Sequence, residues 1–130
     1  MVKKNYAVAN LEKIINASPE RVMPPCPIYD KCGGCQLQHF VYQAQLEMKR
    51  QKVKDALLHL GHLECNVLPV LGMQKPYYYR NKMQFPVGNF GNKLAIGCYA
   101  VKTHQVTDTK ICLIQSEDNN VVFNYFRHNI

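Results

Sequence analysis

The sequence predicts an α+β fold: a small antiparallel sheet with one long helix, a Cys-rich metal loop and a C-terminal helix. Three observations support this class. Apolar residues recur at helical spacing between Tyr42 and Leu60, other residues alternate at strand spacing between 77 and 108, and three cysteines precede the long helix in the pattern C-x5-C-x2-C. With 130 residues, of which 47% are hydrophobic, the chain is long enough to bury a core.

Residues 1–16 are predicted to contain a strand, because apolar residues alternate from Tyr6 to Leu11. One strand cannot make a sheet, so we expect it to be the last strand of a β domain whose other strands are missing. This divides the chain into residues 1–22, the end of a truncated β domain with its linker, and residues 23–130, the main domain. Nothing in the sequence ends the last helix, so we expect the main domain to be cut at its C-terminus.

The loop that contains Cys26, Cys32 and Cys35 has the features of a metal site. Two glycines between the last two cysteines permit the tight turn that aims thiolates at one point, and nearby prolines keep the approach extended. A four-ligand site would need a fourth ligand from elsewhere. Four interpretations stay open on this pattern alone: reduced buried cysteines, a zinc site completed by His39 or a distant cysteine, an iron–sulfur cluster completed by a distant cysteine, and a disulfide framework.

The clearest helix is predicted over about residues 42–60 and ends at Gly61. Its apolar stripe consists of Tyr42, Leu46, Val53, Ala56, Leu57 and Leu60. Lys49 lies inside the stripe and Arg50 at its edge. Either both side chains extend past apolar surface and keep their charges in water, or they cross a groove and contact phosphate.

The period shifts toward two after Asn66, which predicts strands. The expected elements are a short edge strand at 67–71, a strand over 77–88, a turn at 89–92, a partner strand at 94–100 and a third strand at 105–108. Arg80 and Lys82 would share one face of the 77–88 strand. That pair either faces solvent or contacts the phosphates of a nucleic acid.

Cys112 follows the predicted strands and lies far along the chain from the other clustered cysteines. Ser116 is predicted to cap a final helix, because a hydroxyl accepts well at this position and acidic residues follow it. The apolar side of that helix is expected to consist of Val121, Val122, Tyr125 and Phe126.

The net charge of +7 is unevenly placed, since residues 66–112 contain six lysines and arginines against the single acid Asp108. Such a distribution is either a solvated basic face or a nucleic-acid footprint. The chain has no signal-peptide pattern and no apolar run long enough to cross a membrane, so we expect a soluble cytoplasmic protein with no membrane partner. In such a chain, clustered cysteines bind metal more often than they form disulfides.

Together these residues resemble the RNA uracil-5-methyltransferases, particularly the bacterial enzymes that modify 23S ribosomal RNA. The resemblance extends from about residue 6 to about residue 120. It rests on Pro24-Pro25-Cys26-Pro27, Cys32-Gly33-Gly34-Cys35 with Gln36 to His39, Gln45-Leu46 with Lys49, Tyr79-Arg80-Asn81-Lys82, and Cys112 with Ile114-Gln115.

The resemblance implies a [4Fe–4S] cluster held by Cys26, Cys32, Cys35 and Cys112. It also implies that the first strand belongs to a TRAM domain, a small RNA-binding barrel. Family members bind S-adenosylmethionine and carry the nucleophilic cysteine in a further domain. We therefore expect no catalytic residue and no S-adenosylmethionine site in this chain, which alone would be inactive.

On this interpretation the chain supplies the cluster scaffold and RNA recognition, with 23S ribosomal RNA as the expected partner. The candidate RNA contacts are Lys49, Arg50, Arg80 and Lys82. The cluster is expected to be lost or replaced by zinc when the chain is isolated in air. The alternative functions are a stand-alone zinc-binding nucleic-acid module and a small electron carrier.

Overall fold

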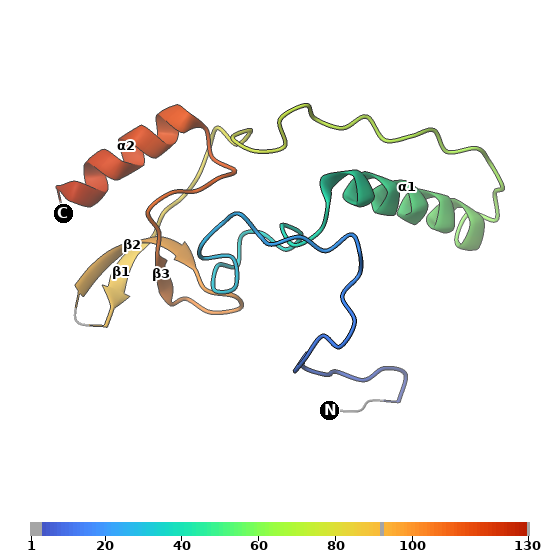
Figure 1. Ribbon diagram of the computed structural model, residues 1–130, viewed down its shortest axis with the longest axis horizontal. Coiled ribbons are helices and arrows are strands. Elements are labelled where there is room, and N and C mark those ends of the chain that lie inside the picture. Colours follow the sequence, from blue (N-terminus) through green and yellow to red (C-terminus); the bar gives the residue numbers. More distant parts are fainter. Residues whose placement is uncertain (1–3, 92, 130) are drawn as a thin grey trace.

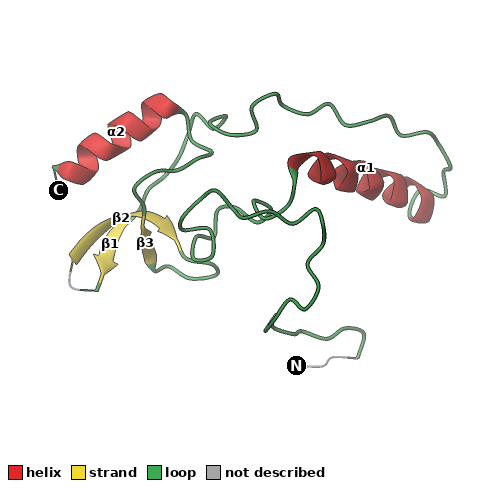
Figure 2. Cartoon of the chain, viewed as in Figure 1, coloured by secondary structure: helices red, strands yellow, loops and turns green. Residues whose placement is uncertain are grey.

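The computed structural model describes residues 4–91 and 93–129 and has the α+β class that the sequence predicts (Figure 2). The elements in chain order are α1 (Tyr42–His59), β1 (Val87–Phe90), β2 (Lys93–Tyr99), β3 (Val106–Asp108) and α2 (Glu117–His128). In Figure 1 the sheet and α2 lie at one end of the molecule and α1 at the other, with the cysteine loop between them. The long helix, the small antiparallel sheet and the C-terminal helix are therefore confirmed.

The sheet is a simple meander in the order β1-β2-β3, with both pairs antiparallel. Phe90 pairs with Lys93, so only two residues join β1 to β2. The first of them, Gly91, has a φ of 63°, which glycine adopts without strain. The turn is thus narrower than the predicted 89–92, and Asn92 lies outside the described residues.

The predicted strand over 77–88 is wrong for most of its length, because only its end belongs to β1. Pro86 has no N–H group to donate to a neighbouring strand. Upstream, the backbone pairs with a different segment: Tyr78 N–H donates to Leu113 O at 2.9 Å and Arg80 N–H donates to Ile114 O at 2.8 Å. Arg80 and Lys82 therefore do not share the face of a regular strand.

The predicted edge strand at 67–71 is also absent from the structure, where this segment is irregular. Its backbone is tied to the side chains of α1 instead of to a sheet. Arg50 Nε donates to Val67 O at 2.8 Å, and the Tyr42 hydroxyl accepts from Met73 N–H at 2.9 Å. These contacts hold the long return segment along α1.

The predicted N-terminal strand is not formed by residues 4–16, which show no more than an isolated bridge at Ala7. Residues 1–3 lie outside the described part of the chain. The N-terminal segment lies away from the three-stranded sheet (Figure 1), so no strand of that sheet is near enough to pair with it.

The helices begin where expected, but their buried faces differ from the prediction. In α1 only Leu46 is buried and Val53 is 50% exposed, while Leu60, directly after the helix, is 82% exposed. In α2 the Ser116 hydroxyl caps the helix by accepting from Asn119 N–H at 3.3 Å, as predicted. The buried residues of α2 are Asn120 and Phe123, whereas the predicted apolar side, Val121, Val122, Tyr125 and Phe126, is exposed.

The core lies between the sheet and α2. Ile96 of β2 and Phe123 of α2 are buried and line one hollow there. Ala95, Val106 and Ile114 are the other buried apolar residues around the sheet and the segment before α2. Phe85 stacks on Phe123 with ring centroids 4.1 Å apart, which sets the side of α2 that packs inward. None of the described helices is long and apolar enough to span a membrane.

Candidate metal centre

The four cysteines predicted as ligands, Cys26, Cys32, Cys35 and Cys112, line a single cavity. Cys98, on β2, lines it as well. The cavity is narrow, with a volume of about 20 Å³. All six cysteines are free thiols, so the structure contains none of the disulfides of the fourth interpretation. The fold therefore brings Cys112 beside the early cysteines, as the predicted site requires.

The early cysteines are positioned by a run of tight turns. Tyr29 N–H donates to Cys26 O at 3.1 Å, and Cys32 N–H donates to Ile28 O at 2.9 Å. Gly34 N–H then donates to the Cys32 sulfur at 3.3 Å. These bonds curl the backbone between Cys26 and Cys35, so that sulfurs nine residues apart face the same cavity.

The cysteine loop is attached to the end of β2, the central strand of the sheet. Cys32 forms an antiparallel bridge with Ala100, and Gly33 N–H donates to Tyr99 O at 3.0 Å. A Cβ atom on Gly33 would lie 3.3 Å from that oxygen, tighter than most real contacts. Glycine at this position lets the loop approach the backbone at the end of β2 closely.

Cys112 is positioned by Asn120 of α2, a residue that the sequence did not suggest. The Asn120 amide accepts from Cys112 N–H at 3.0 Å and donates to Cys112 O at 3.0 Å. Asn120 is only 6% exposed. Both backbone groups of Cys112 are thus satisfied by one buried side chain, which fixes the direction in which its thiol leaves the chain.

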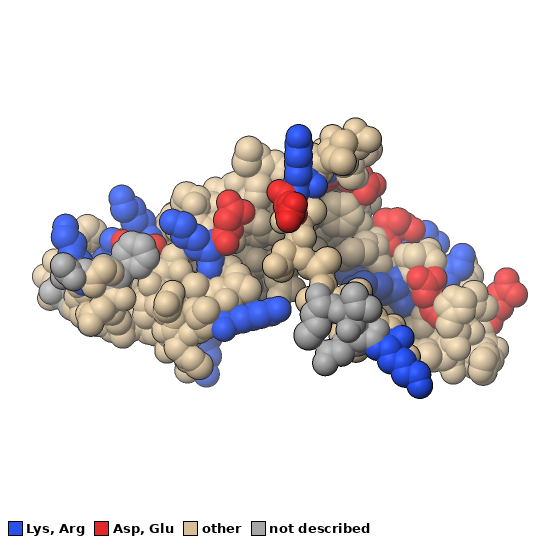
Figure 3. Space-filling model, turned by 90° about the horizontal axis from the view of Figure 1, so that it is seen from below, with Lys and Arg blue, Asp and Glu red and all other residues tan. Residues whose placement is uncertain are grey.

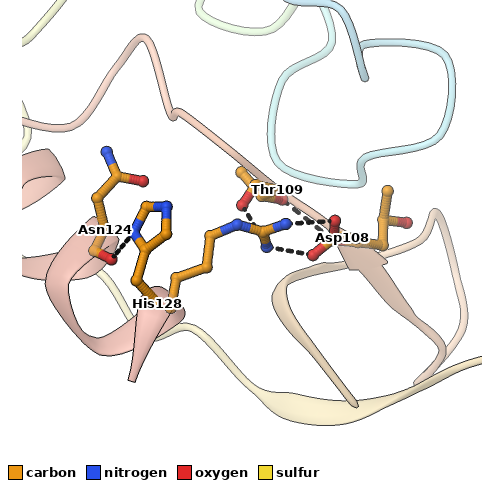
Figure 4. Close-up of polar contacts among 6 residues, drawn as sticks. Asp108, Thr109, Asn124 and His128 are labelled. Carbon is orange, nitrogen blue, oxygen red and sulfur yellow. Dashed lines mark hydrogen bonds and ion pairs between the residues drawn. The ribbon is translucent and has the colours of Figure 1, made fainter. Parts of the chain in front are cut away.

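An ion pair anchors α2 to the sheet near this point (Figure 4). The Arg127 guanidinium donates to both carboxylate oxygens of Asp108 at the end of β3, and to Thr109 O at 3.2 Å. This bidentate geometry is the stronger form of an arginine–carboxylate ion pair. It holds the helix that contains Asn120 against the segment that leads to Cys112.

The thiols of the cavity differ in acidity. Cys98 and the Gly34 N–H group donate hydrogen bonds to Cys32, and they lower the Cys32 pKa to about 6 despite its burial. Hydrogen bonding to Cys32, together with burial, raises the pKa of Cys98. Burial raises the pKa of Cys26 and of Cys35. Without a bound cation, Cys32 is mainly a thiolate at neutral pH, and thiolate is the form that binds metal.

His39, the candidate fourth ligand of a zinc site, is engaged elsewhere. Its Nδ1 lies 2.5 Å from the Tyr29 hydroxyl. Gln38 does line the cavity, and its Oε1 is buried without a hydrogen-bond partner. Within the described part of the chain, no group of three or more His, Cys, Asp or Glu side chains is arranged to hold a metal ion. The cysteines share a cavity without already standing at coordinating positions.

The predicted RNA contacts occupy different surroundings. Lys49 lines an open hollow of about 420 Å³ beside Cys35, together with Tyr77 and Tyr79. Arg50 instead binds Val67 O and pairs with Glu47 at 3.4 Å, so its charge is used within the chain.

The other two predicted contacts lie nearer the sheet. Arg80 donates to the Met83 sulfur at 3.3 Å, and Lys82 lines a second hollow, of about 470 Å³, beneath α2. Figure 3 shows mainly basic side chains on the end of the molecule that contains the sheet and α2, and a mixture of both signs around α1.

This chain is similar to known proteins over most of its length. No protein-family model matches the chain. A curated Clostridium tetani protein named "uncharacterized RNA methyltransferase" is 58% identical over 116 residues, which cover 89% of this chain and 25% of that protein. Proteins so named from Listeria monocytogenes and Staphylococcus epidermidis are 44% and 43% identical, over 92% and 98% of this chain. The chain spans about a quarter of the length of these curated relatives.

Proposed function

We propose that this chain, which is homologous to one segment of bacterial RNA methyltransferases, forms the metal-binding and RNA-binding part of such an enzyme. The proposed reaction is S-adenosylmethionine-dependent methylation of carbon 5 of a uracil, in 23S ribosomal RNA, in the cytoplasm. The chemical step belongs to the part of the relatives that this chain does not span. The chain itself positions RNA and is inactive alone.

The observation that supports the metal site is the shared cavity. It is lined by thiols from the 26–35 loop and by Cys112, which is separated from that loop by α1 and the whole sheet. Four thiolates form the donor set of iron–sulfur clusters, and soft sulfur ligands select this kind of centre. In the proposal Cys26, Cys32, Cys35 and Cys112 hold a [4Fe–4S] cluster.

The proposed role of the cluster is structural. When bound, it cross-links the loop to Cys112 and so closes a long stretch of chain whose ordering is otherwise costly. No described group of these side chains is already arranged around a metal ion, so the loop would shift to bring its sulfurs to a common centre. The two glycines before Cys35 are the positions at which the backbone turns most freely.

The proposed RNA surface is the hollow beside Cys35. Lys49 offers a cation that can contact a phosphate, and it is exposed. Tyr77 and Tyr79 offer rings on which an unpaired base can stack, and Tyr79 is 51% exposed. A cation beside aromatic rings suits single-stranded or looped RNA, which must be open for a base to reach an enzyme pocket.

The decisive experiment is metal analysis of the chain purified without air. We expect iron and sulfide in equal amounts with the broad visible absorption of a cluster. Cys112→Ser should abolish this absorption, because it removes the only distant ligand. The matched control, Cys65→Ser, should keep it, because Cys65 is exposed and outside the cavity lining. Stoichiometric zinc without iron would instead support the stand-alone zinc module.

A further inference from the structure

Of the five cysteines that line the cavity, Cys98 is the one outside the proposed ligand set. It lines the cavity together with Cys32 and Thr109, and the thiols of Cys32 and Cys98 shift one another's pKa. Thr109 is almost fully buried and is itself bound to Thr107 O at 3.0 Å. The Cys98 side chain is therefore held next to Cys32 by its surroundings.

The backbone pairing explains this contact. Cys32 is bridged to Ala100, and the flanking hydrogen bonds join Gly33 to Tyr99 O and Val101 to Lys31 O. Alternate residues of an extended strand point to the same side, so Cys98 faces the same side as Ala100. Cys98 is thus the diagonal neighbour of Cys32 across this pairing.

The diagonal position is close to the geometry of a disulfide. Diagonal neighbours lie about 7–8 Å apart between Cα atoms, just beyond the usual range for disulfides, so the bond requires a shift of the backbone. The remaining backbone shift is small, and Gly33 and Gly34 directly after Cys32 can supply it. Cys35 is less well placed to compete, because its side chain is hydrogen-bonded to Gln38.

We propose that Cys32 and Cys98 form a reversible disulfide in the metal-free chain, and that this bond blocks metal loading. The oxidant is a small disulfide such as oxidised glutathione. One protein thiolate attacks it and releases one small thiol, and the second protein thiol then displaces the other small thiol. The two protein sulfurs become joined, the small disulfide is reduced to two thiols, and the two protein thiol protons end on those thiols.

The position of Cys98 makes it accessible to a small disulfide and lets the resulting bond withhold Cys32 from metal. Besides the cavity, Cys98 lines an open hollow on the outer side, together with Gly33, Gly34 and Lys102. A small disulfide can therefore reach it from solvent. The bond would withhold Cys32 from a metal centre and shield it from further oxidation until a thiol reduces it. Formation of the disulfide does not depend on the proposed function. Its effect on metal loading rests on the proposed function, because that function supplies the metal site.

The test uses the full chain with Cys65→Ser, which removes the exposed thiol. The chain is freed of metal under reducing conditions and incubated without air in excess oxidised glutathione. After alkylation and digestion, mass spectrometry should show a Cys32–Cys98 cross-link, a loss of two hydrogens and complete loss of alkylation at both residues. Cys26 should remain fully alkylated. Cys98→Ser and Cys98→Ala, each checked for folding by circular dichroism, should retain a glutathione adduct on Cys32.

A second measurement separates this inference from the proposed function. Reconstitution with ferrous iron and sulfide should fail in the oxidised chain and recover fully after a thiol reductant, whereas unoxidised Cys98→Ser should load iron as the parent does. A Cys32–Cys35 cross-link, or a stable glutathione adduct in the presence of Cys98, would overturn the disulfide. Failure to bind iron under every condition would overturn the proposed function, and the cross-link map would still decide the disulfide.

Discussion

Single residues outside the cysteine motif determine how the thiols that line the cavity are placed. A thiol is useful as a ligand only if its backbone points it at the others, and for Cys112 this direction is fixed by the buried amide of Asn120. Arg127, about two helical turns further along the same face of α2, ties this helix to Asp108. These two residues of α2 make the distant fourth cysteine part of the cavity.

Asn120→Ala should lower the free energy of unfolding by about 2–3 kcal/mol. It leaves the N–H and C=O groups of Cys112 without their side-chain partner, and a buried polar group left unpaired costs about 1–3 kcal/mol. Asn119→Ala is the matched control on the same helix, since its amide makes one exposed bond to Asn81 O at 2.9 Å. Denaturant unfolding of both variants measures the difference, and equal losses would contradict the role given to Asn120.

The pair between Asp108 and Arg127 should make stability depend on acid pH. Hydrogen bonding to Arg127 holds the pKa of the Asp108 carboxyl below its usual value of 3.8. The folded chain then takes up this proton less readily than the unfolded chain. The contribution of the pair is complete above about pH 4 and is lost as pH falls below it.

Asp108→Asn should therefore lower the free energy of unfolding by about 1 kcal/mol at neutral pH, in the upper part of the range for partly exposed pairs. The difference in unfolding free energy between this variant and the parent should shrink as pH falls. Unfolding by denaturant at a series of pH values measures this. Curves that stay parallel down to about pH 3 would show that Asp108 has the same pKa in both states.

At the scale of elements, the sheet depends on how closely β2 and β3 approach each other. Gly97 pairs with Asp108, and a Cβ atom at Gly97 would lie 1.9 Å from Thr107 O. No side chain fits there without separating the strands. Because β2 also supports the cysteine loop and contains Cys98, a change in this pairing also reaches the cavity.

Gly97→Ala should therefore destabilise the fold by at least about 3 kcal/mol, as expected when a core is overpacked against backbone. Gly91→Ala is the comparison: nothing lies within 4 Å of its Cβ position, and only its φ of 63° is unfavourable for alanine. That strain costs about 1–2 kcal/mol. Thermal unfolding should show a larger loss of stability for Gly97→Ala than for Gly91→Ala. Similar losses would mean that β2 and β3 can separate at little cost in free energy.

At the scale of the whole molecule, α1 stands apart from the sheet and α2 (Figure 1), and the cysteine loop joins the two ends. Gln45 strengthens this junction, because its Nε2 donates to Leu37 O at 3.0 Å and to Phe40 O at 2.7 Å. The hollow that contains Lys49 lies at the same junction. RNA bound there would contact both the helix and the cysteine loop.

Lys49→Ala should weaken binding of short single-stranded RNA at all sequences and reduce the slope of log affinity against log salt by about 1, as the loss of one phosphate contact does. Lys54→Ala, an exposed lysine of the same helix outside the hollow, should change neither. Fluorescence anisotropy over a range of salt concentrations measures both. An equal effect of the two substitutions would reduce the hollow to part of a general basic surface.

Much of the local structure could be predicted from the sequence, because local causes dominate it. The span of α1, the Ser116 cap and the β1–β2 hairpin follow from periodicity, a hydroxyl at the cap and a glycine in the turn. The Cys26–Cys35 loop and the distant Cys112 were also evident as a set. Its assignment as a cluster site stays a prediction for metal analysis.

The tertiary structure decided what each element packs against. Periodicity identified apolar stripes on α1 and α2, but the stripe on α1 is largely exposed, and α2 packs through Asn120 and Phe123. The alternation over 77–88 gave no strand, since its backbone pairs with residues 113–116 instead. Asn120 and Cys98 gained their roles for the same reason: contacts between residues far apart in the chain depend on the assembled fold, and local sequence patterns do not encode them.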